Sequence, residues 1–183
     1  MQIPENAKKV FEGIIFDTYQ WKQKQFDGSV QTFEMLTRPN TVQILPIVGD
    51  KILVVQEEQP NDGREFFGLV GGQENKGEQS LTAAIREMKE EVGYTSETWE
   101  LWNTKNLYTR IDWTVSTFIA RNCKKTLEPH LDPGEKITPL LVSFDEFMEI
   151  ITDPGFRSKD LTLDILILQY QNKLDEFKKM LFS

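Results

Sequence analysis

The stretch from Gly72 to Tyr94, GQENKGEQSLTAAIREMKEEVGY, decides the fold. Its apolar residues recur at the spacing of an amphipathic helix, whose apolar stripe must face a core. We expect Ser80 to cap the start of this helix and Gly93 to end it. The residues expected in the apolar stripe are Leu81, Ala84, Ile85, Met88 and Val92.

Three glutamates of the same stretch, Glu87, Glu90 and Glu91, fall within an arc of about 100° when the chain is wound at about 3.6 residues per turn. Carboxylates this close repel each other unless one of them is protonated or a cation binds. A dense set of oxygen ligands suits Mg²⁺, Mn²⁺ or Ca²⁺ rather than zinc. The glycines ahead of the helix allow a tight loop, so a backbone carbonyl of Gly71 or Gly72 could complete the coordination. The spacing therefore predicts a divalent-metal site.

The stretch also matches the pattern G-x5-E-x7-R-E-U-x-E-E-x-G-U, in which U is an apolar residue. Met88 and Tyr94 stand at the two U positions, and the fixed positions hold Gly72, Glu78, Arg86, Glu87, Glu90, Glu91 and Gly93. This sequence resembles the Nudix box. The resemblance implies an α+β (mixed α/β) fold, a Nudix-type α/β/α sandwich, and an enzyme that cleaves nucleoside diphosphates linked to another group X at the pyrophosphate.

The resemblance also implies roles for the box residues. Glu87, Glu90 and Glu91 would hold Mg²⁺ (or Mn²⁺), which activates the attacking water. Arg86 is expected to brace a glutamate through a bidentate pair while pointing away from the carboxylates. Glu78 has two readings that stay open, a further metal ligand or a cap near the positive end of the helix.

Around the box, most of the chain resembles ADP-ribose pyrophosphatases and related nucleotide-sugar hydrolases. This divides it into an N-terminal β extension, residues 1–40, and a Nudix domain, residues 41–183. In that group the extension often builds a homodimer. Dinucleoside polyphosphates, nucleoside triphosphates and a non-catalytic nucleotide-sensing role remain as alternatives. The chain has Glu57-Glu58-Gln59-Pro60 where the group commonly shows Gln-x-Arg.

Further site residues are expected outside the box. Asp132 to Ile137 resembles the acidic loop from which these pyrophosphatases supply a glutamate, so Glu135 is the candidate general base. Aromatic rings can stack on a nucleobase and arginines can bind phosphates. The substrate-binding candidates of these two kinds are Trp21, Tyr108, Arg64 and Arg110.

Net charge and cysteine content indicate which partners and which compartment are expected. A formal net charge of −8 argues against binding to nucleic acid or to an anionic membrane surface, but not against a small nucleotide substrate. The single cysteine, Cys123, excludes an internal disulfide and favours a reducing cytoplasm. No signal peptide or membrane span is expected.

Periodicity and turn residues predict the remaining elements. A hairpin is expected through Asp27-Gly28, and a loop at Pro60-Asn61-Asp62-Gly63. A long loop is expected from Leu127 to Pro139. We expect strands at 9–22, 29–38, 41–48, 51–57, 65–70, 99–110 and 112–123, and helices at 143–151 and 160–182.

Overall fold

The computed structural model describes residues 3–60 and 63–183. Its main sheet has the strand order β13-β5-β4-β11-β9, with β6 paired to β5 and β7 paired to β4. Only β11 and β4 run parallel; the other pairs in this sheet are antiparallel. The strands are β4 (Thr41–Val48), β5 (Lys51–Glu58), β6 (Glu65–Gly68), β7 (Val70–Gln73), β9 (Thr98–Asn106), β11 (Thr114–Arg121) and β13 (Lys136–Val142).

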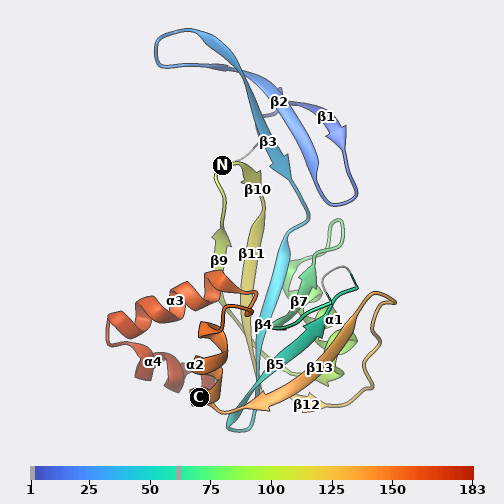
Figure 1. Cartoon of the computed structure of the whole chain (residues 1–183), viewed down its shortest axis with the longest axis vertical. Coiled ribbons are helices and arrows are strands. Elements are labelled where there is room, and N and C mark those ends of the chain that lie inside the picture. Colours follow the sequence, from blue (N-terminus) through green and yellow to red (C-terminus); the bar gives the residue numbers. More distant parts are fainter. Residues whose placement is uncertain (1–2, 61–62) are drawn as a thin grey trace.

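Helices cover both faces of this sheet. Helix α1 (Ser80–Val92) packs on one face, and α2 (Phe144–Thr152), α3 (Lys159–Tyr170) and α4 (Leu174–Phe182) pack on the other (Figure 1). Strand alternation explains the two cores, because Ile44 on β4 faces α1 while its neighbour Leu45 faces α2 to α4. The expected α/β/α sandwich is confirmed. In the described part of the chain, no helix is long and apolar enough to cross a membrane.

The N-terminal extension forms a second, separate sheet that projects beyond one end of the sandwich (Figure 1). It contains β1 (Lys8–Glu12), β2 (Asp17–Lys24) and β3 (Val30–Thr37), and β10 (Ile111–Asp112) joins its edge from the body of the chain. The β2–β3 hairpin turns through Gly28, whose φ of 85° suits glycine, as the Asp-Gly pair predicted. Two further short strands, β8 (Tyr94–Thr95) and β12 (Lys124–Lys125), pair with each other.

Several expectations about elements were wrong. The strand expected at 9–22 is broken by a turn at Gly13 to Phe16, and the helix expected at 160–182 is broken at Asn172, whose φ is 58°. The loop expected up to Pro139 ends in strand β13. Pro139 is tolerated there because β13 is an edge strand. Asn61 and Asp62, in the loop expected after Pro60, lie outside the described residues.

The N-cap of the box helix lies one residue earlier than expected. Gln79, not Ser80, occupies the N-cap position, and the Ser80 hydroxyl donates instead to Glu74. Leu81 was placed in the apolar stripe but is 41% exposed. Gly93 ends the helix with φ 71°, as predicted, and a Cβ there would lie 2.1 Å from the carbonyl oxygen of Leu127.

Candidate active site

A pocket of about 770 Å³ lies between helix α1, the ends of β5 and β7, and the loop that precedes β13. We call it the carboxylate pocket, because acidic side chains from all of these segments except β7 line it. Arg86 is the only arginine or lysine among the described residues that line this pocket, and the only ring in that lining is the imidazole of His130. Its acidic lining consists of Glu57, Glu87, Glu90, Glu91, Asp132 and Glu135.

Glu91 is the most deeply buried of these acids, with 8% of its surface exposed. Burial raises its pKa well above the ordinary value, and the negative charges of Glu87, Glu135 and Glu57 act in the same direction. The backbone N–H of Gly71 donates to its Oε2 at 2.9 Å and partly opposes the shift. Glu91 is therefore a carboxylate for which a bound cation would be a favourable neighbour.

Glu87 lies beside it under a similar constraint. Its pKa is raised, first by burial, while the hydrogen bond from Arg86 lowers it. A Cβ on Gly72 would stand 2.4 Å from Glu87 Oε1, so the absence of a side chain at residue 72 makes room for this carboxylate.

Arg86 binds three glutamates at once. Its Nε and Nη2 donate to the two oxygens of Glu78 at 3.1 and 3.0 Å, and this pair holds the pKa of Glu78 below its usual range. Its Nη1 donates to Glu87 at 2.8 Å and to Glu90 at 3.0 Å. The bidentate geometry is as expected, but the prediction that Arg86 points away from the carboxylates was wrong, because one guanidinium reaches Glu78 and the box carboxylates together.

The loop that carries Glu135 is attached to the end of the box helix. The N–H groups of Thr126 and Leu127 donate to the carbonyl of Gly93, and the N–H of His130 donates to the carbonyl of Glu90 at 2.7 Å. The side chain of Glu135 accepts the N–H of Asp132 at 3.0 Å. These bonds hold an exposed acid opposite Glu87 and Glu91 in the same pocket.

The donor chemistry of the pocket fits a hard divalent cation. Buried, mutually repelling carboxylates with raised pKa values are stabilised by such an ion, and oxygen is its preferred ligand. With the side chains in their present conformations, no three Asp, Glu, His or Cys residues within 3–60 and 63–183 are arranged to hold a metal. The reason is visible in the hydrogen bonds, because Arg86 occupies Glu87 and Glu90 and the Gly71 amide occupies Glu91. Rotation of these side chains would be needed to form a coordination shell.

The four candidates for substrate binding do not line the carboxylate pocket. Trp21 is buried in the extension and packs on Phe33, with ring centroids 4.9 Å apart. Arg110 lies over the same Phe33 ring at 4.0 Å. Arg64 lines a separate cavity of about 450 Å³ between the start of β6 and residues 154–159, and Tyr108 stacks on Trp113 with ring centroids 5.9 Å apart. Their contacts with a substrate stay predictions.

The sequence did not predict several residues of the pocket, which are Glu57, Gln59, Gln73, Asn75, His130 and Asp132. The amide of Gln59 donates to Glu57 at 2.8 Å and orients it. A signal for Glu57 was present, since it ends a strand that leads toward the box and replaces a residue of the Gln-x-Arg pattern. Glu57 pairs on β13 with Ile137, which follows Glu135 by two residues. The sequence did not predict this strand, so it could not place Glu57 near Glu135.

Comparisons with known proteins agree with this geometry. A family model described as the NUDIX domain matches residues 37–160. The chain is 25% identical over 176 residues to an ADP-ribose pyrophosphatase of Bacillus subtilis (strain 168), covering 93% of this chain and 94% of that protein. It is 24% identical over 151 residues to a methanol dehydrogenase activator of Bacillus methanolicus, covering 81% and 82%.

A solved structure described as an ADP compounds hydrolase superposes with a TM-score of 0.73 at 21% sequence identity. The match covers 92% of this chain and 95% of that one. At this identity the similarity establishes the shared fold, including the extension, which the family model leaves out up to residue 36.

Proposed function

This chain belongs to the NUDIX domain family and is a Nudix pyrophosphohydrolase, and we propose that it cleaves, with a divalent metal, the pyrophosphate of ADP-ribose or a nucleotide sugar. The observation that carries the proposal is the carboxylate pocket, in which four glutamates of the box and loop converge: Glu87, Glu90, Glu91 and Glu135. The names of the Bacillus subtilis relative and of the solved structure favour an ADP-containing substrate.

We assign the metal to Glu87, Glu90, Glu91 and the carbonyl of Gly71, with Glu78 as a further ligand or as the partner that orients Arg86. When bound, Mg²⁺ or Mn²⁺ neutralises pyrophosphate oxygens, polarises the phosphorus and lowers the pKa of the attacking water. Arg86 balances the glutamates in the metal-free site, and Glu87 and Glu90 would have to leave Arg86 to serve as ligands. Trp21, Arg64, Tyr108 and Arg110 are retained as proposed substrate contacts, of which Tyr108 is the best supported because it is exposed and already stacked.

Glu135 is the proposed general base. It would accept a proton from the water that attacks phosphorus, and the hydrogen bond from the Asp132 N–H orients its carboxylate. Its carboxylate lines the same pocket as Glu87 and Glu91, the proposed metal ligands.

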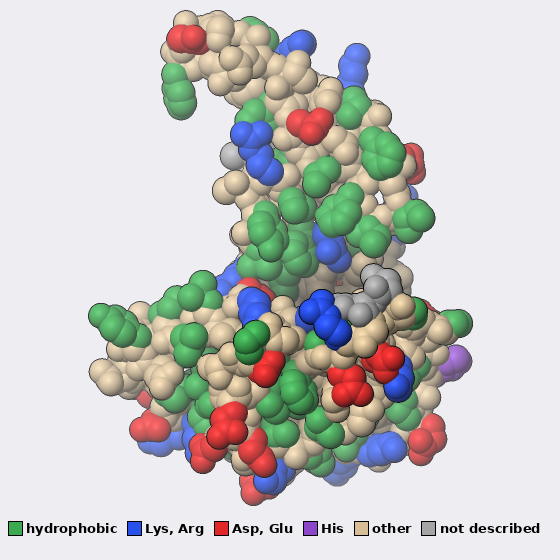
Figure 2. Space-filling model, in the orientation of Figure 1, with side chains coloured by type: hydrophobic (Ala, Val, Ile, Leu, Met, Phe, Trp, Pro, Cys, Tyr) green, Lys and Arg blue, Asp and Glu red, His purple; other side chains and the backbone are tan. Residues whose placement is uncertain are grey.

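The extension supports a homodimer. Large apolar side chains lie exposed on it, among them Phe11 (61%), Ile14 (104%) and Phe26 (112%), and Figure 2 shows hydrophobic side chains along its length. Patches of this kind on a projecting sheet are typical of interaction surfaces.

Cys123 is buried and burial raises its pKa to about 11, so a reactive thiol is absent from the described residues and a reducing cytoplasm remains the proposed compartment.

A substrate panel tests the proposed reaction. ADP-ribose, ADP- and GDP-sugars, dinucleoside polyphosphates and nucleoside triphosphates are each incubated with Mg²⁺ or Mn²⁺, and products are separated by chromatography. We expect a nucleoside monophosphate to be released from ADP-ribose or a nucleotide sugar, and no release in EDTA. Preferential cleavage of dinucleoside polyphosphates or triphosphates would replace this substrate class by the other.

The relative named as an activator of methanol dehydrogenase favours a second candidate, a Nudix domain that senses a nucleotide and acts on a partner enzyme. The complete set of box glutamates counts against a purely non-catalytic role. If every member of the panel stays intact while a nucleotide still binds, this second candidate replaces the first.

A further inference from the structure

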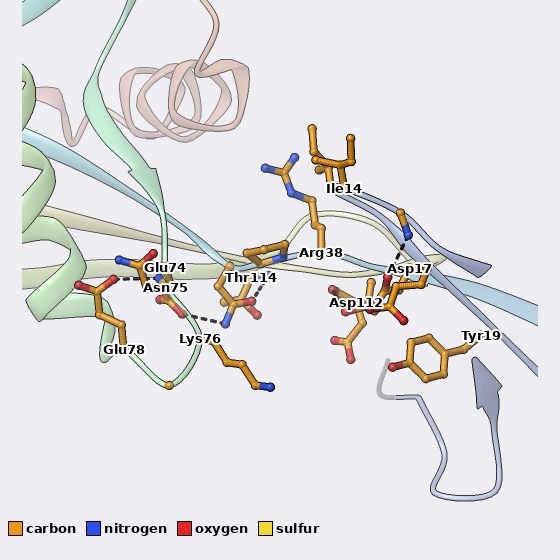
Figure 3. Close-up of a pocket in the computed structure, with 17 residues that line it drawn as sticks. Ile14, Asp17, Tyr19, Arg38, Glu74, Asn75, Lys76, Glu78, Asp112 and Thr114 are labelled. Atoms are coloured by element: carbon orange, nitrogen blue, oxygen red, sulfur yellow. Dashed lines mark hydrogen bonds between the residues drawn. The ribbon is translucent and has the colours of Figure 1, made fainter. Parts of the chain in front are cut away.

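A second cavity, of about 690 Å³, lies where the extension meets the box loop. We call it the junction pocket. One side comes from the β1–β2 turn, the end of β3 and β10, and the other comes from residues 74–78, just ahead of α1 (Figure 3). Its volume falls in the range of small-molecule sites, about 300–1,000 Å³.

The two pockets are neighbours across one short loop. Asn75 lines both of them, and Glu78, which lines the junction pocket, is held by Arg86 of the carboxylate pocket. The loop at residues 73–78 therefore separates the two pockets and contributes Asn75 to both. For a molecule whose pyrophosphate lies against the box glutamates, the junction pocket is the adjacent cavity.

Arg38 lines the junction pocket in an unusual environment. Its guanidinium carbon lies 4.5 Å from the ring centre of Trp113 and 5.5 Å from that of Phe16, so the guanidinium contacts two aromatic rings. Its buried Nε has no hydrogen-bond partner, and within residues 3–60 and 63–183 its side chain forms no ion pair. A buried donor without an acceptor is destabilising, and an oxygen acceptor supplied by a ligand would relieve this.

Asp112 offers the complementary group. Its backbone carbonyl accepts from Thr37, but its carboxylate makes no hydrogen bond or ion pair with the described chain. Figure 3 shows Asp112 and Tyr19 on the same side of the cavity as Arg38, opposite Asn75 and Glu78. By contrast, the nearby Asp17 is already paired with Lys9 at 2.6 Å. The lining thus provides one free carboxylate and one arginine with a free donor.

The remaining lining favours a hydroxylated ligand over an apolar one. Thr37, Thr114, Asn40 and Asn75 contribute hydroxyl and amide groups, and polar atoms make up the larger part of the lining. A free carboxylate that accepts hydrogen bonds from vicinal hydroxyls is a common way to recognise a sugar ring. A nucleobase would find one ring, Tyr19, in the lining.

We propose that the junction pocket binds the sugar of group X in a nucleoside diphosphate sugar, with Asp112 accepting hydrogen bonds from its hydroxyls and Arg38 donating to one of its oxygens. This inference rests on the proposed function, because it assumes that the pyrophosphate occupies the carboxylate pocket. It makes the extension a determinant of selectivity within a single chain.

Binding of two non-hydrolysable probes tests the proposal. Isothermal titration calorimetry with Mg²⁺ compares the α,β-methylene analogues of ADP-ribose and of ADP, which differ by the terminal sugar. We expect wild-type protein to bind the ADP-ribose analogue about tenfold or more tightly than the ADP analogue, as for one or two hydrogen bonds to charged groups. Asp112→Asn and Arg38→Lys should remove most of this difference and leave affinity for the ADP analogue unchanged. Asp145→Asn, which alters a side chain that is 91% exposed on α2, is the matched control.

The outcomes separate this inference from the proposed function. Equal binding of the two probes by wild type, or equal weakening of both by the Asp112 and Arg38 variants, would overturn the sugar site, the second result because it indicates a structural role. If Mg²⁺-dependent hydrolysis is nevertheless observed in the substrate panel, the proposed function stands without the sugar site. If neither probe binds and no substrate is cleaved, both fail.

Discussion

Arg86 shows how single residues balance charge in this site. One guanidinium binds Glu78, Glu87 and Glu90, so the carboxylates of the box are partly compensated before any cation binds. Glu91 lies outside this compensation and is stabilised by one backbone amide. The buried charge of Glu91 therefore destabilises the metal-free fold, whereas the proposed metal site needs that charge.

Replacing Glu91 by Gln should lower Mg²⁺-dependent turnover by about 100-fold or more, because a metal ligand is lost. The same change should raise the free energy of unfolding of the metal-free protein at pH 7 by roughly 1–2 kcal/mol, since it removes a buried charge while keeping the acceptor for the Gly71 amide. Kinetics and urea denaturation measure the two effects. Glu149→Gln, an exposed helical position, is the control.

The pH dependence follows from the direction of the shift. The pKa of Glu91 is raised by folding, so the native state binds this proton more tightly than the unfolded state. The stabilisation is present below the ordinary glutamate pKa and is lost as pH rises through the raised value. Metal-free wild type should thus lose stability between acidic and neutral pH, and Glu91→Gln should flatten this slope. An identical slope in both proteins would contradict the assignment.

Replacing Glu135 by Gln should lower kcat by about 100-fold or more and leave the affinity for Mg²⁺ nearly unchanged, as expected for a general base. Glu128→Gln is a matched control, because Glu128 belongs to the same loop and its side chain is 90% exposed. A large loss of Mg²⁺ affinity in Glu135→Gln, with kcat retained at saturating metal, would reassign Glu135 as a ligand.

Gly71 allows β7 to pass close to β4. Its φ is 153°, and a Cβ would lie 2.1 Å from the carbonyl oxygen of Val42. Gly71→Ala should therefore destabilise the protein by about 2–4 kcal/mol, measured by thermal or urea unfolding. Gly134→Ala, where a Cβ meets nothing within 4 Å, should change stability little.

At the scale of elements, the sequence was informative where side-chain periodicity and turn chemistry agree. Helix α1 ends at the predicted Gly93, and β4 and β5 lie where their β-branched runs indicated. Strand β13 was missed because it carries Pro139 and lies at an edge, so its pairing with β5 is long-range information. The box glutamates were found from spacing alone, whereas Glu57 required knowledge of that pairing.

The same limit explains the uncertain substrate contacts. Aromatic and arginine residues were chosen by type, and Trp21, Tyr108 and Arg110 were found in ring contacts within or beside the extension. Arg38 was not chosen, although it lies between two aromatic rings. Arg38 contacts Phe16 and Trp113 only because distant segments come together in the folded chain. The spacing of residues along the sequence does not predict these contacts.

At the scale of the whole molecule, exposed apolar side chains concentrate on the extension, and we expect a second copy to cover them. Phe26→Glu and Phe11→Glu should shift the protein from dimer to monomer in size-exclusion chromatography with light scattering. Leu101→Glu, on exposed β9, should not. A wild-type monomer at micromolar concentration would contradict the dimer.

The extension is joined to the sandwich through a narrow connection. Strand β3 pairs with β10 over two register pairs, Leu36 with Ile111 and Thr37 with Asp112, and then continues directly into β4. A sheet attached this way can open as a unit while the sandwich stays folded. Its amide protons should then exchange with solvent earlier than those of β4 and β11, so the rate at which deuterium enters β1 to β3 becomes a direct record of how often the two parts of the chain separate.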